Sequence, residues 1–187
     1  MPGRIYNDLF DLATERYGFV TPHDARKLGI DPQRLVVMND RGVLARVAHG
    51  LYRFPSIPPT GLEEFMQATL WPRGQGVISH ESALDLHELC DVNPAKIHVT
   101  VPADYRLRRQ IPDTYVFHQR QLADEDRTLH EGIPIVTPRR AILDGIESGL
   151  RGGLIDQAIE TAQARGLIRK NDVALLAQSR RAAKQSA

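Results

Sequence analysis

Polar side chains capable of reading DNA recur on one side of the segment 31–42. By spacings of three and four residues, Gln33, Arg34, Val37 and Arg41 share a helical face, and Asn39 stands close to it. Gln and Asn can pair with adenine and Arg with guanine in the major groove. The pattern predicts a DNA-contacting face, although the solvated face of an ordinary surface helix would look the same.

A second group of side chains suits contacts with the sugar-phosphate backbone. Arg46, His49 and Arg53 lie on or beside a predicted β-ribbon, and Arg26 and Lys27 stand on the helix before the polar face. A cation in such a position attracts phosphate whatever the base sequence. Ordinary surface charge is the alternative for each of them taken singly.

Two short helices are expected to carry these groups. Thr21 is a good N-cap, Pro22 suits the first helical position, and Asp24 stands three residues after the cap. We include Thr21 with the residues expected at the DNA interface. Leu28 is expected to face inward, and Gly29 supplies the positive φ that ends the helix. The pair at 31–32, Asp-Pro, repeats this start for the next helix, which should end near residue 42.

A ribbon should follow the second of these helices. Residues 43–47 and 51–54 have the composition of strands, and the segment 48–50 is a plausible turn between them. Together with a first helix over 4–16, this order predicts a winged helix-turn-helix. The Pro-rich segment 55–61 is the best linker in the chain, so we expect a DNA-binding domain over 1–56 and a second domain over 60–187.

Composition narrows the class of protein. The 187 residues carry a net charge of +1, but residues 1–54 have eight basic against six acidic side chains, 55–164 have ten against sixteen, and 165–187 have six against one. The basic N-terminal and C-terminal segments, on either side of an acidic central segment, suit a protein that contacts phosphate groups. Cys90 is the single cysteine, and neither a secretory leader nor a membrane-length apolar run is apparent. We therefore expect a cytoplasmic protein with no membrane contact.

The rest of the chain mixes predicted helices and strands. Helices are expected over 62–70, 82–89, from 137 to about 146, 154–165 and 171–181, and strands over 76–79, 96–101, 114–118 and 133–136. The expected fold class is α+β: the winged helix-turn-helix followed by an α+β domain with a small sheet and C-terminal helices.

Four blocks in the chain resemble the AbiEi family, the antitoxins of type IV toxin–antitoxin systems. They are GVLARVAHGLYR (42–53), VISHESAL (77–84), IHVTVP (97–102) and GIPIVTPRRAILD (132–144). The first resembles the wing of that family, and the others resemble recurring blocks of its second domain in the same order. The resemblance covers most of the chain, from about residue 5 to about residue 170.

The resemblance implies a function for each domain. Such antitoxins bind inverted repeats in their own promoter through the winged helix domain, and through the second domain they counter a nucleotidyltransferase-like toxin, without necessarily forming a stable complex with it. Repeated half-sites would suit a dimer or a cooperative pair of monomers on DNA. The alternative is a winged-helix transcriptional regulator whose second domain binds a ligand or a protein.

Five arginines are possible contacts of the second domain. Arg106, Arg108 and Arg109 form a compact basic run, and Arg139 and Arg140 stand in the first turn of a predicted helix. A positive charge in the first turn of a helix is unfavourable because it meets the positive end of the helix dipole, so a functional role for these two arginines is worth considering. Contact with a nucleic acid or phosphate and a salt bridge to the acidic run 124–126 are both open.

Neither a metal site nor a catalytic set is expected. His80, Glu81 and His87 invite a metal interpretation, but the two histidines are seven residues apart, whereas the two-histidine zinc helix places them four apart. There is no phosphate-binding Gly loop, nucleophile elbow or paired-carboxylate signature. We expect no cofactor and no enzymatic activity. An enzyme that modifies the toxin or a nucleic acid is the third and least supported hypothesis.

Overall fold

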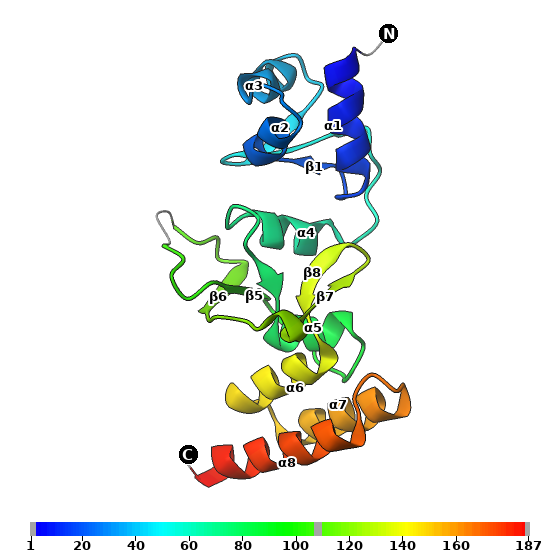
Figure 1. Cartoon of the computed structure of the whole chain (residues 1–187), viewed down its shortest axis with the longest axis vertical. Helices are drawn as coiled ribbons and strands as arrows, with labels where there is room; N and C mark the ends of the chain where they lie inside the picture. The colour runs from blue at the N-terminus through cyan, green and yellow to red at the C-terminus, as the bar shows by residue number, and fades with distance from the viewer. Residues whose placement is uncertain (1–2, 107–109, 186–187) are drawn as a thin grey trace. The chain divides into compact units, whose positions relative to one another are not determined.

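The computed structural model describes residues 3–106 and 110–185, and it divides into two compact units, 1–74 (first unit) and 75–187 (second unit). The chain mixes helices with two sheets, which confirms the α+β class (Figure 1). The predicted domain limits, 1–56 and 60–187, differ from this division by assigning the helix at 63–70 to the second domain, and they stay a prediction.

The first unit contains four helices and a small sheet in its described residues. Its elements are α1 (Arg4–Thr14), β1 (Phe19–Val20), α2 (Pro22–Lys27), α3 (Gln33–Asp40), β2 (Ala45–Ala48), β3 (Leu51–Arg53) and α4 (Glu63–Leu70). The strand order is β1-β3-β2, with antiparallel pairing throughout. Helices α1 to α3 followed by the β2–β3 hairpin are consistent with a winged helix-turn-helix.

A single apolar cluster holds α1 to α3 against the hairpin. It includes Leu9 from α1, Leu35 from α3 and Phe54, none of which is exposed to solvent. The ring of Phe54 also meets those of Tyr6 and Phe10 edge-on, at centroid distances of 5.5 and 5.3 Å. Burial of these side chains fixes the angle between α3 and the hairpin, and with it the position of the predicted DNA-contacting residues.

Two details of the first unit differ from the sequence-based expectation. Leu28 is 38% exposed rather than facing inward, because α2 ends at Lys27 and the chain turns away through Gly29. The two-residue strand β1, which pairs Phe19 with Arg53 and Val20 with Tyr52, was not expected. Gly29 adopts φ +68°, as the helix-ending role required.

The second unit is a mixed sheet with helices at its C-terminal end. Its elements are β4 (Val77–Ile78), α5 (His80–Leu86), β5 (Ile97–Val101), β6 (Tyr115–Gln119), the short 3₁₀ helix η1 (Asp124–Asp126), β7 (Arg127–His130), β8 (Ile133–Val136), α6 (Pro138–Glu147), α7 (Gly152–Ala164) and α8 (Lys170–Gln185). The strand order is β6-β5-β4-β8-β7, with β5–β6 and β4–β8 parallel and the other pairs antiparallel.

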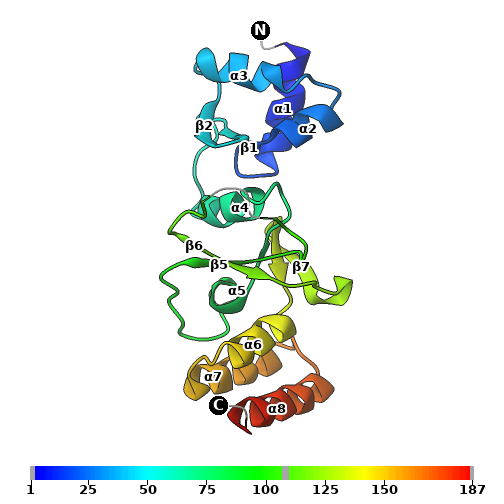
Figure 2. The same ribbon diagram turned by 90° about the vertical axis from the view of Figure 1, so that its left-hand side faces the viewer.

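Helix α5 packs between this sheet and the C-terminal helices. It contacts β5 on one side and α6 on the other, and α6 in turn contacts α7 and α8 (Figure 2). The residue Thr137 caps α6 by accepting a hydrogen bond from the backbone nitrogen of Arg140, as its Thr-Pro start predicts. Because α5 begins directly after β4 and α6 directly after β8, the N-terminal ends of both helices lie close to these two neighbouring strands of the sheet.

Candidate nucleic-acid interface

The start of α2 is fixed by a reciprocal capping box. The backbone nitrogen of Asp24 donates to Oγ1 of Thr21 (3.2 Å), and the backbone nitrogen of Thr21 donates to Oδ2 of Asp24 (2.9 Å). The hydroxyl of Thr21 donates to the same carboxylate at 2.7 Å. Asp24 is 2% exposed and pairs through Oδ1 with Nη1 of Arg16 at 2.7 Å. Thr21 therefore serves as a helix cap in this structure.

Helix α3 presents the polar face that the sequence indicates. Gln33, Arg34 and Arg41 are exposed, while Val37 and Asn39 are half-buried. The carboxylate of Asp31 accepts a hydrogen bond from the backbone nitrogen of Gln33 at 2.9 Å, but α3 begins at Gln33 with Pro32 at its N-cap position, one residue later than the Asp-Pro pair predicts. A groove-reading helix needs a polar, partly basic face of this kind.

One hydrogen bond joins α3 to the hairpin. Oδ1 of Asn39 accepts from the backbone nitrogen of Arg46 at 2.9 Å. The guanidinium of Arg46 lies 3.2 Å from Nδ1 of His49 at the hairpin turn, and both side chains are exposed. The predicted residues Asn39, Arg46 and His49 are thus brought together, and the hairpin cation is held in a fixed register with the end of α3.

Arg53 has a different environment from the other predicted DNA contacts. Its Nε donates to the backbone carbonyl of Tyr17 (3.1 Å), and its Nη2 donates to that of Ile57 (2.8 Å). The guanidinium also lies over the ring of Phe19, 6.0 Å from the centroid. Arg53 therefore ties β3 to the segments on either side, and the basic composition of the ribbon gave no sign of this.

Five cations remain on the surface of α2, α3 and the hairpin. Arg26 and Lys27 occupy the last turn of α2, and they are exposed like Arg34, Arg41 and Arg46. Within residues 3–106 and 110–185, no ion pair neutralises any of the five. Unneutralised, exposed cations are suited to phosphate contacts.

The predicted arginines of the second unit have mixed positions. Arg106 is exposed, whereas Arg108 and Arg109 lie outside the described residues. Arg139 pairs with Asp126 at 2.5 Å, so the salt-bridge alternative describes its position. Arg140 is 8% exposed, and its guanidinium pairs with Asp144 and Glu147.

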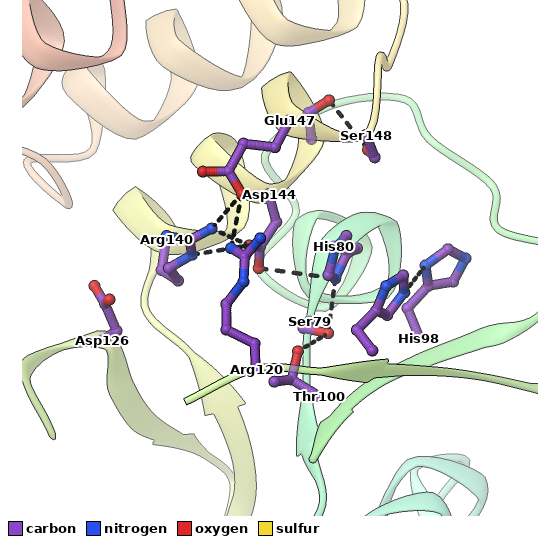
Figure 3. A network of polar contacts seen from close by, with 12 residues as sticks. Ser79, His80, His98, Thr100, Arg120, Asp126, Arg140, Asp144, Glu147 and Ser148 are labelled. Carbon is purple, nitrogen blue, oxygen red and sulfur yellow. Dashed lines mark hydrogen bonds and ion pairs between the residues drawn. The ribbon is translucent and has the colours of Figure 1, made fainter. Parts of the chain in front are cut away.

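A buried network surrounds Asp144 in the second unit (Figure 3). Its Oδ1 accepts from Nε of Arg140 at 2.8 Å and from Nη1 of Arg120 at 3.2 Å, and both arginines also reach Glu147. Burial raises the pKa of Asp144, and the two arginines oppose that rise. Oδ2 of this buried carboxylate has no hydrogen-bond partner among the described residues, and it faces Nδ1 of His80 at 3.8 Å.

The histidines of the candidate metal pattern lie in separate environments. His87 contacts the backbone carbonyl of Val136 through Nε2 at 2.8 Å, and burial lowers its pKa. His80 instead stacks on His118, with ring centroids 3.5 Å apart, and His98 lies next to them. Sequence reasoning missed His98 and His118, because no local spacing connects positions on two strands and a helix.

Protonation is disfavoured throughout this histidine group. Burial, the neighbouring histidines His118 and His98, and the cations Arg120 and Arg140 lower the pKa of His80 to about 3. Burial, His98 and Arg120 lower the pKa of His118 to about 4. The pKa of His98 is lowered by burial as well. The three imidazoles are neutral at physiological pH.

Comparisons with known proteins agree with the geometry of the first unit. No curated protein matches the chain. Its fold is similar to that of the crystal structure of the RV2827C protein from Mycobacterium tuberculosis, with a TM-score of 0.50 and 15% identity over 94% of this chain and 72% of that one. None of the helices in the described part of the chain has the length and apolar character that a membrane crossing needs.

A family model matches the segment that carries α1 to α3 and the hairpin. The family is described as a transcriptional regulator, AbiEi antitoxin, and the match covers residues 7–55. This finding supports a DNA-binding regulator. Over its N-terminal region, residues 7–55, the chain is matched by the AbiEi antitoxin family of transcriptional regulators, which confirms the resemblance of the block 42–53, while that of the three later blocks stays a prediction.

Proposed function

We propose that the protein is the DNA-binding antitoxin of a type IV toxin–antitoxin system, which represses its own operon and counteracts a nucleotidyltransferase-like toxin. The first unit binds an operator made of repeated half-sites, on which two copies sit together. The second unit provides the antitoxin activity. The protein acts in the cytoplasm by binding rather than by catalysis.

The observation that carries the DNA-binding part is the link between α3 and the hairpin. The Asn39–Arg46 hydrogen bond aligns a hairpin cation with the exposed residues of α3, among them Arg34 and Arg41. In a winged helix that binds DNA, the helix reads the major groove while the wing holds the phosphate backbone. A fixed distance between the two elements is what such simultaneous contact requires.

The assignment of antitoxin activity to the second unit rests on the family resemblance of its sequence blocks. The match over residues 7–55 supports a regulator. The alternative, a regulator whose second unit binds a ligand or a protein, differs from the antitoxin only in the activity of residues 75–187. A toxin-rescue measurement separates the two.

DNA binding is tested by fluorescence anisotropy of the full chain on the DNA upstream of its own gene. The variants Arg34→Ala, Arg41→Ala and Arg46→Ala should each weaken binding. Where a phosphate contact is lost, the negative slope of log K against log salt should become less steep by about 0.9. Arg4→Ala is the matched control, because Arg4 is an exposed arginine of the same unit on α1, with a side chain that is 94% exposed. Unchanged affinity of the triple variant would refute the DNA-binding part.

Antitoxin activity is tested by co-expression with the nucleotidyltransferase-like protein that the proposal predicts to be encoded beside it. Full-length protein should restore growth, and the triple arginine variant should restore it equally well when both genes are driven from an unrelated promoter. If the wild type binds its operator and gives no rescue, the plain regulator is the correct function. Mass spectrometry of the toxin after rescue checks the non-enzymatic part, since a mass change would show that the chain modifies it.

A further inference from the structure

Three imidazole rings from three different elements converge in the second unit. His80 is the first residue of α5, His98 belongs to β5, and His118 belongs to β6. One ring nitrogen from each lies within 4.8 Å of the other two. Nδ1 of His98 and Nε2 of His118 are 3.1 Å apart.

The sheet register brings about this convergence. In the parallel β5–β6 pair, Thr100 lies opposite His118, so His98 and His118 are diagonal neighbours on one face of the sheet. The backbone nitrogen of Ser79 donates to the carbonyl of His98 at 3.0 Å, which places the next residue, His80, beside the same face. The cluster is therefore built into the sheet pairing.

The buried side of the cluster supplies partners for the second nitrogen of His80. Its Nδ1 lies 2.9 Å from Oγ of Ser79, and that hydroxyl oxygen accepts a hydrogen bond from Thr100 at 2.8 Å (Figure 3). Oδ2 of Asp144, buried and lacking a hydrogen-bond partner among the described residues, faces the same nitrogen. The carboxylate of Asp144 favours a proton on Nδ1, and the hydroxyl of Ser79 is able to accept it, which leaves the lone pair on Nε2 available to a metal.

This arrangement has the form of a histidine ligand with its outer partners. Metal-binding histidines donate their other N–H to a carboxylate or a similar acceptor, which fixes the tautomer and the ring orientation. His80 also adopts φ +53°, a conformation that a non-glycine residue rarely adopts and that clusters at functional sites.

We propose that His80, His98 and His118 bind one zinc ion, with a water molecule as the fourth ligand. Neutral imidazole nitrogens suit zinc and other late first-row metals and do not suit Mg²⁺ or Ca²⁺, which take oxygen ligands. The 3.1 Å between the nitrogens of His98 and His118 is close to the roughly 3.3 Å that separates two ligands at Zn–N bonds of about 2.05 Å in a tetrahedral site. The ring of His80 stacks on that of His118, so it has to turn about its side-chain bonds when the ion binds.

Access and charge agree with this assignment. His98 and His118 are half-buried whereas His80 is buried, so the cluster opens to solvent on the strand side. The lowered pKa values of His80 and His118 mean that no proton has to leave before the metal binds at neutral pH. The ion would join α5 to β5 and β6. The metal-site proposal is independent of the DNA-binding proposal, since all three ligands belong to the second unit.

The test uses full-length protein without a histidine tag, freed of metal by a chelator. Titration with Zn²⁺ in a calorimeter should give one site per chain, and saturation should raise the Tm by roughly 10 °C at a metal concentration 100-fold above Kd. Mg²⁺ should give no binding. X-ray absorption of the zinc-loaded wild type should show three imidazole nitrogens at about 2.0–2.1 Å, a measurement that needs no variant.

Variants locate the site. His98→Ala and His118→Ala should abolish stoichiometric zinc binding. If His118→Ala does not fold, His118→Phe replaces it, because phenylalanine keeps an aromatic ring against His80 and should abolish zinc binding as well. His130→Ala is the matched control, because His130 is a half-buried histidine of the same unit on β7, outside the cluster. The proposal is overturned if the wild type takes up no zinc, or if zinc binding persists in the His98 and His118 variants.

Discussion

The side-chain oxygen of Asn39 on α3 accepts a hydrogen bond of 2.9 Å from the backbone nitrogen of Arg46 on β2. Asn39→Ala removes this acceptor and should lower the free energy of unfolding of the first unit by about 0.5–1.5 kcal/mol. Asn39→Asp keeps an acceptor and adds a negative charge beside the proposed DNA path. Urea unfolding and anisotropy should therefore separate the two variants: Ala loses stability, and Asp loses DNA affinity with little loss of stability. Equal DNA affinity of Asp and wild type would argue against a DNA path beside Asn39.

The capping box at α2 gives a prediction about stability alone. Asp24 is 2% exposed and is held by both Thr21 and Arg16, so Asp24→Ala removes a cap and leaves a cation without its partner. We expect a loss of about 3 kcal/mol, against about 1 kcal/mol for Thr21→Ala, which removes the cap alone. Denaturant midpoints with unchanged m-values check the ranking. A smaller effect for Asp24→Ala than for Thr21→Ala would show that the Arg16 pair does not stabilise the fold.

Asp144 holds the polar network of the second unit. Asp144→Ala leaves Arg140, which is 8% exposed, without its nearest counter-charge and should cost about 3–5 kcal/mol. Glu147→Ala is the milder control, because the Glu147 side chain is 41% exposed. The double variant Arg140→Met, Asp144→Leu should recover most of the stability lost in Asp144→Ala, as an apolar pair can replace a buried ion pair. Thermal unfolding of the three variants gives the comparison, and a double variant no more stable than Asp144→Ala contradicts it.

Acidification should destabilise the metal-free second unit. The pKa values of His80, His87, His98 and His118 are all lowered in the folded state, that of His80 from 6.5 to about 3 and that of His118 from 6.5 to about 4. Below about pH 6.5 the histidines of the unfolded chain bind protons that those of the folded chain do not bind, so the free energy of unfolding falls as the pH is lowered. The raised pKa of Asp144 acts in the opposite direction, because its folded state takes up a proton at a higher pH than the unfolded chain does.

The pKa of Asp85 is raised by burial as well, but four lowered histidine pKa values outweigh these two raised carboxyl pKa values, so the net effect should be a loss of stability between pH 7 and pH 5. Urea unfolding followed by circular dichroism in the presence of a chelator measures it. The variant His118→Phe should show a weaker pH dependence than the wild type, whereas the exposed residue His23 serves as the control in His23→Gln. Higher stability at pH 5 than at pH 7 would mean that the buried carboxyls Asp144 and Asp85 dominate.

Local chemistry made the helix starts predictable. Thr21 and Thr137 cap helices that begin at the next residue, a proline, and Gly29 has the positive φ that its position required. These features depend on side chains within three or four residues of one another, which a sequence displays directly. The exposed face of α3 was predictable for the same reason.

Contacts between distant segments were not predictable. Arg53 looked like a basic ribbon residue, but its Nε donates to the carbonyl of Tyr17, which lies 36 residues earlier in the chain. Strand β7 (Arg127–His130) is mostly exposed and polar, so it lacks the alternation that marks a half-buried strand. The meeting of His98 with His118 depends on the register of β5 against β6, which no local pattern specifies.

The pairing of β4 with β8 has a consequence for how the protein is made. Ile78 lies opposite Ile135 in the middle of the five-stranded sheet, so the sheet cannot close until the chain has been synthesised past residue 136. The first unit draws all its strands from residues 19–53 and can form on the ribosome long before that. Long-range strand pairing also slows folding. A nascent chain should therefore pass through a stage in which the first unit is folded while the second unit is still unfolded, because its central strands have not yet paired.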